Sequence, residues 1–189
     1  MSRAYRIRVR ESLKRNLRAR DKVSTQMELL EILPADDMAG LLAEELERRG
    51  FRRRGENLVR KQGGVTVTVD TASATVTVEA ETEEKVKLEG EKSGWGYNDA
   101  GPAEKQTREA IQKELAKDLD RQAKEREASL QSQVTAKLEA QLDDLRKELD
   151  QVANRVTADA LKRKAAQLGQ IKELTEDPES GSMTIVLEV

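Results

Sequence analysis

Apolar and polar residues alternate with a period of two near the start of the chain. In residues 4–17, AYRIRVRESLKRNL, the apolar side chains fall on odd positions and most Arg and Lys side chains on even ones. This period is typical of a strand with one buried face. The same parity resumes in residues 23–29, after RARDK, and we predict a two-stranded hairpin. The part ESLKRNLR alone also fits a short helix, because Leu13 and Leu17 are four positions apart.

Residues 33–51, LPADDMAGLLAEELERRGF, predict a helix. Pro34 and the two Asp that follow suit a first turn, and Gly50 suits the C-terminal end. The apolar stripe comprises Met38, Leu41, Leu42 and Leu46.

Three short strands are predicted after this helix. The segments NLVRK (57–61), VTVTVD (65–70) and TVTVEAETEEKVKLE (75–89) are joined by the turns GG and TASA. The alternation of Val and Thr is a strong strand signal.

Residues 103–168 contain no Gly and no Pro and are rich in helix formers. Pro102 suits a first helical position and Gly169 a stop. Unbroken, the helix would be on the order of 100 Å long. Its apolar stripe, which follows heptad spacing in the second half, has to be buried. We predict one continuous helix that pairs with another subunit; the alternative is a helix that folds back near residues 128–135.

The last residues, QIKELTEDPESGSMTIVLEV, predict a β-hairpin around the turn EDPESGS. Two strands alone are marginally stable, so we expect the hairpin to join the sheet of a partner or of its own chain. The predicted fold class is α+β, with an antiparallel β-sheet head and one packed helix (1–99), a long coiled-coil-like helix (100–168) and the C-terminal β-hairpin (169–189).

Composition narrows the chemistry. The chain has no Cys and no His, which excludes disulfides, thiolate nucleophiles, His-ligated metals and the serine–histidine triad. The net charge of −2 is not that of a general nucleic-acid or membrane binder. There is no signal-peptide pattern and no long apolar run. We expect a soluble, cytoplasmic protein.

A basic block is the first candidate site. Alternating basic residues near the N-terminus and an Arg triplet further on could contact phosphates or an acidic protein partner, of which we favour the partner. The alternative is that these basic residues form a solvated face with no ligand, with their charge balanced by nearby Glu side chains. The base-stacking aromatics of single-strand binders are absent from this face. The candidate contact residues are Arg6, Arg8, Arg10, Lys14, Arg52, Arg53 and Arg54.

The stretch SGWGYNDAGP, residues 93–102, is the second candidate site. It holds the only Trp and one of two Tyr, in a chain that is 2% aromatic. We interpret Trp95 as a packing plug at the base of the long helix, with Gly94, Gly96 and Gly101 permitting a turn. The alternative is that Trp95 and Tyr97 anchor an interface.

No catalytic, cofactor-binding or metal-binding residues are predicted. The adjacent acidic pairs at 36–37, 44–45 and 143–144 point about 100° apart on a helix, so we assign them to helix caps and solvated faces. Gly63 and Gly64 lie between two strands and predict a hairpin turn rather than a phosphate loop.

The layout resembles a known family. The strand YRIRVRESL, the segment VSTQMELLEILP, the helix ending ELERRGF, the long Glu/Arg/Gln helix and the ending GQIKELTEDPESGSMTIVLEV are similar to accessory proteins encoded beside an FtsH-like AAA+ ATPase and a von Willebrand factor A protein in bacterial ternary systems. A small family of cyanobacteria and plastids associated with such ATPases has a similar layout. The resemblance implies an accessory or adaptor role with ATPase partners and transfers no catalytic residues.

We therefore predict a non-enzymatic scaffold or adaptor of an AAA+ ATPase-associated complex, without cofactor, that self-associates through its long helix. The alternative is a nucleic-acid-binding protein that uses the Arg-rich head. An enzyme with clustered carboxylates ranks last.

Overall fold

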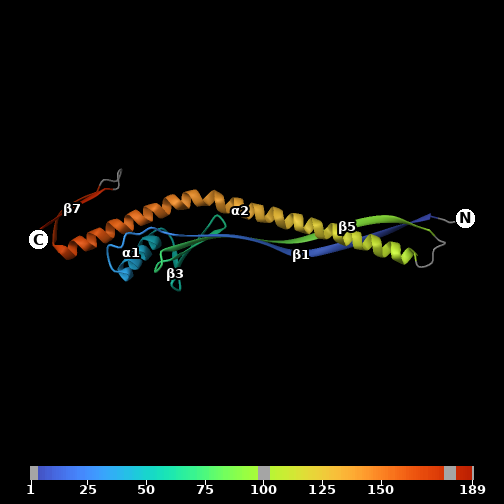
Figure 1. The fold of residues 1–189 in the computed structure, drawn as a ribbon, viewed down its shortest axis with the longest axis horizontal. Helices are drawn as coiled ribbons and strands as arrows, with labels where there is room; N and C mark the ends of the chain where they lie inside the picture. The colour runs from blue at the N-terminus through green and yellow to red at the C-terminus, as the bar shows by residue number, and fades with distance from the viewer. Residues whose placement is uncertain (1–3, 98–102, 177–181, 189) are drawn as a thin grey trace. The chain divides into compact units, whose positions relative to one another are not determined.

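The computed structural model describes residues 4–97, 103–176 and 182–188. The fold is α+β (Figure 1), as predicted, and its elements follow in this order: β1 (Ala4–Gln26), α1 (Ala35–Arg48), β2 (Arg52–Arg54), β3 (Asn57–Gln62), β4 (Val65–Asp70), β5 (Thr75–Tyr97), α2 (Ala103–Leu168), β6 (Gln170–Glu176) and β7 (Met183–Glu188). The predicted roles of Gly101, of Pro102 and of the turn at 177–181 lie outside the described residues.

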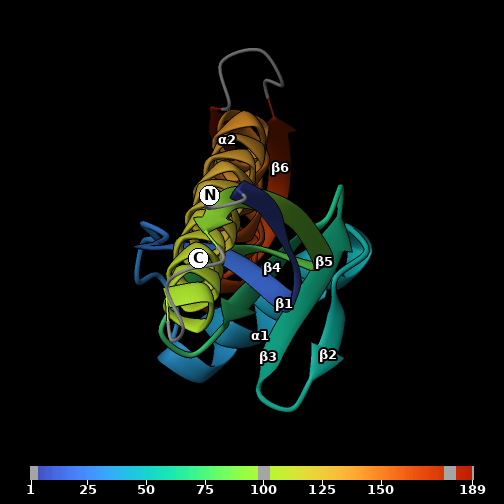
Figure 2. The same ribbon diagram turned by 90° about the vertical axis from the view of Figure 1, so that its right-hand side faces the viewer.

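A five-stranded sheet has the order β1-β5-β4-β3-β2, and its short β2 lies beyond β3 at one edge (Figure 2). The turn between β3 and β4 is the two-residue loop predicted from the glycine pair, with Gln62 opposite Val65. Gly63 and Gly64 have φ of 60° and 78°, a conformation that favours glycine and matches the twist of the hairpin strands.

β1 is one strand of 23 residues, so the predicted hairpin within residues 4–29 is wrong, as is the helical alternative for ESLKRNLR. The odd parity continues without interruption through the segment read as a turn, because Leu17 and Ala19 are both buried. RARDK contains no Gly, Pro or Asn to reverse the chain. β1 pairs with β5 instead.

α2 is a single helix of 66 residues. It runs without a break through residues 128–135, which confirms the continuous helix and excludes the folded-back alternative. Its apolar stripe is already buried within the chain, whereas the sequence assigned that stripe to a second subunit. The buried members are Ile111, Leu115, Leu119, Ala123, Leu130, Val134, Leu138, Leu145, Leu149, Val152, Val156, Ala160 and Ala165.

The chain divides into two compact units, each combining segments that are distant in sequence: residues 1–20 with 81–135, and residues 21–80 with 136–189. These units cut across the sequential division at residues 99 and 168. In the first unit, Ile7 and Val9 of β1 form one apolar cluster with Ile111, Leu115 and Leu119 of α2.

Glycines on β5 let α2 pack closely in this first unit. A Cβ atom on Gly90 would lie 2.7 Å from Leu115 Cδ1, and one on Gly94 would lie 2.6 Å from Ile111 Cδ1. Both glycines are on the even-numbered side of β5, together with Leu88, which packs against the same cluster. The glycines therefore provide space for helix side chains rather than a turn.

In the second unit, an ion pair joins β3 to α2. The Arg60 guanidinium donates to both Glu148 carboxylate oxygens, at 2.7 and 2.5 Å, and to the Arg49 carbonyl at 3.1 Å. It also lies 4.5 Å from the centre of the Phe51 ring. The side chains of Arg60 and Glu148 are 17% and 26% exposed, and the hydrogen bond from Arg60 lowers the pKa of Glu148.

α1 matches its predicted limits and apolar stripe, with Met38, Leu41, Leu42 and Leu46 buried. Two Asp lie in its first turn, and Gly50 follows it with φ of 85°. The C-terminal strands β6 and β7 form the predicted antiparallel hairpin, which is a separate two-stranded sheet in this chain.

Replacing Gly90 by Ala should destabilise the protein by about 1–2 kcal/mol, because the added methyl overpacks buried Leu115. Gly40→Ala is the matched control. Gly40 lies within exposed α1 surface with nothing within 4 Å of its added Cβ, so alanine should stabilise the helix by about 0.5–1 kcal/mol. Urea unfolding measures both. Equal effects of the same sign would contradict the close packing of α2 on β5.

Glu148→Gln should cost about 1–3 kcal/mol of unfolding free energy at neutral pH, because Arg60 loses its charged acceptor while remaining largely buried. The folded pKa of Glu148 is lowered from 4.5, so its contribution is present above pH 4.5 and is lost as the pH falls through the lowered pKa. The difference between wild type and variant should therefore shrink in acid.

Glu47→Gln is the control for this pair, because Glu47 pairs with Arg53 at 3.4 Å on the exposed surface. Its cost should stay below about 0.5 kcal/mol. Chemical denaturation between neutral and acidic pH separates the two variants, and a Glu148 effect that persists in acid would refute the assignment.

Candidate partner-binding surface

The surface that carries most of the predicted site residues is the side of β1 and β5 that faces away from α2. Odd residues of β1, such as Ile7 and Val9, are buried towards the helix, so the even residues point away from it. On β5 the parity is reversed, because Leu88 and Gly90 face the helix. We call the even residues 6–20 of β1 and the odd residues 81–95 of β5 the outer face.

A backbone hydrogen bond from the Met27 N–H to the Ala74 carbonyl, at 2.8 Å, indicates the register of the two strands, and several side-chain contacts share its offset. Arg10 pairs with Glu91 at 2.7 Å, Arg18 with Glu83 at 3.3 Å, and further along Ser24 hydrogen-bonds Thr77 at 3.0 Å. The partners run in opposite directions along the two strands with a constant offset, so β1 and β5 are antiparallel. This register places Arg6 opposite Trp95, and Lys14 opposite Lys87. Arg6, Arg8 and Asn16 instead contact the residue of β5 two positions before the one opposite, namely Ser93, Glu91 and Glu83.

The basic residues predicted on β1 all lie on the outer face. Arg10 and, at 4.0 Å, Arg8 both contact Glu91, while Arg6 donates to the Ser93 hydroxyl at 3.0 Å. The hydrogen bond from Arg10 lowers the pKa of Glu91, so that carboxylate is charged at neutral pH. Lys14 is exposed. Part of the N-terminal basic block is therefore the salt-bridged surface that the sequence offered as an alternative.

Trp95 is 65% exposed, so its interpretation as a packing plug is wrong. The residue belongs to β5 rather than to a loop, and its odd position directs it away from α2. Tyr5, on an odd position of β1, instead packs against the apolar cluster near the start of the helix. Burial, assisted by a hydrogen bond to Glu104, raises the pKa of Tyr5. Tyr97 ends β5, and its side chain lies outside what the structure describes.

The Arg triplet forms β2 and belongs to the other compact unit. All three side chains are exposed, and Arg53 pairs with Glu47 at 3.4 Å. Arg52, Arg53 and Arg54 therefore belong to a different compact unit from the predicted basic residues of β1.

Two basic residues of the outer face were missed by sequence reasoning. Lys85 and Lys87 were read as part of a Glu-rich strand, yet both are exposed on the same face as Lys14. Their odd positions in β5 were the available signal. Lys87 contacts Glu89, which lowers the pKa of that carboxyl.

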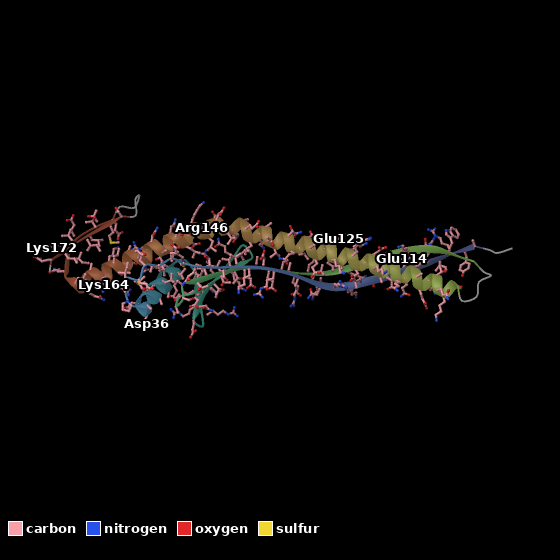
Figure 3. The ribbon with its side chains drawn as sticks, viewed as in Figure 1. Asp36, Glu114, Glu125, Arg146, Lys164 and Lys172 are labelled. Carbon is pink, nitrogen blue, oxygen red and sulfur yellow. The ribbon has the colours of Figure 1, made fainter. Side chains whose placement is uncertain are left out.

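The acidic pairs at 36–37 and 143–144 are exposed, as predicted, but the prediction of a solvated face is wrong for Glu45. Glu45 is buried and pairs with Arg49 at 2.7 Å, while Glu44 pairs with Arg163 at 3.4 Å. Charged side chains, including Glu114, Glu125, Arg146 and Lys164, occur along the length of α2 (Figure 3). Over residues 4–97, 103–176 and 182–188, no three acidic side chains are grouped as a metal site would require.

Comparison with known proteins gives one match. No curated protein and no solved structure is significantly similar to the chain. No helix in the described part of the chain has the length and apolar character needed to cross a membrane. The family model described as FtsH ternary system domain X5 matches residues 1–189, in agreement with the resemblance seen in the sequence. The chain belongs to the FtsH ternary system domain X5 family and is thus a component of an FtsH ternary system.

Proposed function

We propose that the protein is a non-enzymatic adaptor of its FtsH ternary system, which binds a protein partner, the AAA+ ATPase of the system, through the outer face of β1 and β5. The observation that carries this proposal is the position of Trp95. A tryptophan that is 65% exposed on a regular strand, opposite an arginine, leaves a large apolar side chain in water. Trp and Arg are the residue types most enriched among energetic anchors of protein interfaces.

The electrostatics of the described residues support a binding rather than a catalytic role. The shifted carboxyl groups have lowered pKa values, as at Glu91 and Asp120, and the shifted bases have raised ones, as at Lys92. At these three residues a hydrogen-bonded ion pair stabilises the charged form, whereas the pKa of Asp70 is lowered by hydrogen bonds from Ser73 and Ala72. A general acid at neutral pH would need the opposite shift.

Binding of nucleic acid is less well supported. Glu89 and Glu91 lie within the row of basic residues on the outer face, and Glu91 occupies two of the arginines. A phosphate backbone laid along this row would meet both carboxylates. Trp95 is the one aromatic residue described on the outer face, whereas single-strand binders use several stacking platforms.

The proposal includes self-association, for which the C-terminal hairpin offers a better surface than the buried stripe of α2. The pairing of Ile171 with Leu187 and of Leu174 with Ile185 gives the hairpin one apolar face. Leu174 on this face is 40% exposed, Val186 on the opposite face is 42% exposed, and Leu168 before the hairpin is 60% exposed. Each strand of a two-stranded sheet also has one unpaired edge, to which a strand of a second copy can add.

Trp95→Ala should weaken capture of the ATPase component at least about tenfold, as expected for an interface anchor. The free energy of unfolding should change by less than about 0.5 kcal/mol, because the Trp95 side chain is mostly in water. Leu30→Ala is the control, since Leu30 is equally exposed at 65% and lies outside the outer face. Surface-immobilised binding and thermal melts measure the two effects; lost stability with retained capture would reverse the assignment.

Val186→Lys should abolish self-association, because a charge on β7 opposes addition of a further strand. Leu30→Lys introduces the same charge at an exposed position away from the hairpin and should leave the association constant unchanged. Sedimentation equilibrium of the three proteins is the measurement. A wild-type protein that remains monomeric over the whole concentration range would refute this part of the proposal.

A further inference from the structure

The charge balance changes along the outer face. Arg18 lies opposite Glu83, with which it pairs at 3.3 Å, and Arg20 lies opposite Glu81 in the same register. Each basic side chain of β1 in this part has a carboxylate across from it. Nearer the N-terminus of β1, the basic residues outnumber the two acidic ones, Glu89 and Glu91. We call this part the basic zone; it comprises Arg6, Arg8, Arg10, Lys14, Lys85 and Lys87.

The centre of the basic zone brings like charges together. The register places Lys14 directly opposite Lys87. Asn16 lies opposite Lys85, and its side-chain amide donates to the Glu83 carboxylate. Like charges opposite one another destabilise a strand pair. Lys87 contacts Glu89, but Lys14 and Lys85 are exposed without an ion-pair partner among the described residues. Opposite charges are therefore paired across the strands in one part of the face, and like charges are opposed in the next. Such local departures from favourable pairing are expected at functional sites.

From this juxtaposition we propose that the basic zone binds an acidic, extended segment of the protein partner. β5 itself shows the chemistry required. In EAETE, residues 79–83, carboxylates occupy alternate positions of a strand, and Glu83 pairs with Arg18 of β1 at 3.3 Å. Alternate residues of a strand are about 6.7 Å apart, so an acidic segment with the same alternation matches the spacing of the exposed Lys85 and Lys87 on β5.

An open depression next to the basic zone gives such a segment room. It has a volume of about 540 Å³ and is lined by residues 84–88 of β5 and by side chains of α2, including Arg126. Arg126 pairs with Glu84 in its wall, at 2.9 Å. The other charged residues of the lining are Lys85, Lys87 and Glu125, of which Glu125 lies 3.9 Å from Arg121.

The presence of Glu89 and Glu91 favours a peptide over a nucleic acid as the occupant. A peptide can place a neutral or basic residue opposite these two carboxylates, while a phosphodiester backbone carries a charge at every nucleotide. The partner would then contact two neighbouring parts of the outer face. Its acidic segment would bind the basic zone, whose charges guide association, and Trp95 would supply the anchor.

This inference rests on the proposed function, since it names the partner chemistry of the same face. Its test uses a fluorescent peptide of alternating Glu and Thr, with alternating Gln and Thr as the uncharged reference. The full chain should bind the Glu peptide and not the Gln peptide, with an affinity that falls between about 50 and 300 mM salt.

Lys14→Glu is the decisive variant. It converts the Lys14–Lys87 opposition into an ion pair, so the thermal midpoint should stay unchanged or rise, while peptide affinity should fall roughly fivefold or more. Lys85→Gln should weaken binding without adding an acid. Lys113→Glu is the charge-matched control, because Lys113 is exposed on α2 within the same compact unit, and it should bind as wild type does.

Equal affinity of wild type and Lys14→Glu for the Glu peptide would overturn the inference, and so would tighter binding of a single-stranded oligonucleotide than of the peptide. Either result, with capture of the ATPase still dependent on Trp95, leaves the proposed function standing. Capture that does not depend on Trp95, with Lys14-dependent peptide binding intact, would instead refute the proposed anchor.

Discussion

The structure depends on burying the apolar stripe of one long helix. α2 is polar on its other sides, so only this stripe can pack against the rest of the protein. Most helical stability in proteins comes from such packing. Here β1 and β5 supply the covering surface in the first compact unit, through Ile7, Val9 and the glycines at 90 and 94. In the second unit, the paired Arg60 and Glu148 join the same helix to β3.

Strand geometry then transmits this constraint to the other side of the sheet. Because side chains alternate, choosing which residues face α2 also chooses which residues face away. With odd residues of β1 and even residues of β5 committed to the helix, the arginines at 6, 8 and 10 and the tryptophan at 95 are presented together. The outer face is therefore a consequence of how the core is built, and a shift of one residue in register would bury its charges.

Local signals made much of the fold predictable. The limits of α1 and α2, the glycine turn between β3 and β4, and the C-terminal hairpin each follow from periodicity and breaker residues within a short window. The predicted hairpin in residues 4–29 failed because a pause in apolar residues was taken for a turn, although Ala19 carries the parity through it. Trp95 was misplaced because glycines on either side suggested a loop, when they are the small residues of a strand under a helix. The partner of the α2 stripe, and the opposition of Lys14 to Lys87, depend on long-range register that no single segment encodes.

The alternation of side chains across the sheet also explains why stability and binding are expected to conflict at Lys14. A strand pair selected for stability alone would carry Glu opposite Lys14, as it does opposite Arg10 and Arg18. β5 contains ample Glu for this purpose, and yet it places Lys at 85 and 87 and returns to Glu at 89. Cross-strand pairs contribute only a few tenths of a kcal/mol up to about 1 kcal/mol, a loss that a long, well-packed helix can offset. The fold can therefore tolerate an exposed excess of positive charge beside an exposed Trp, as the proposed binding of an acidic segment requires.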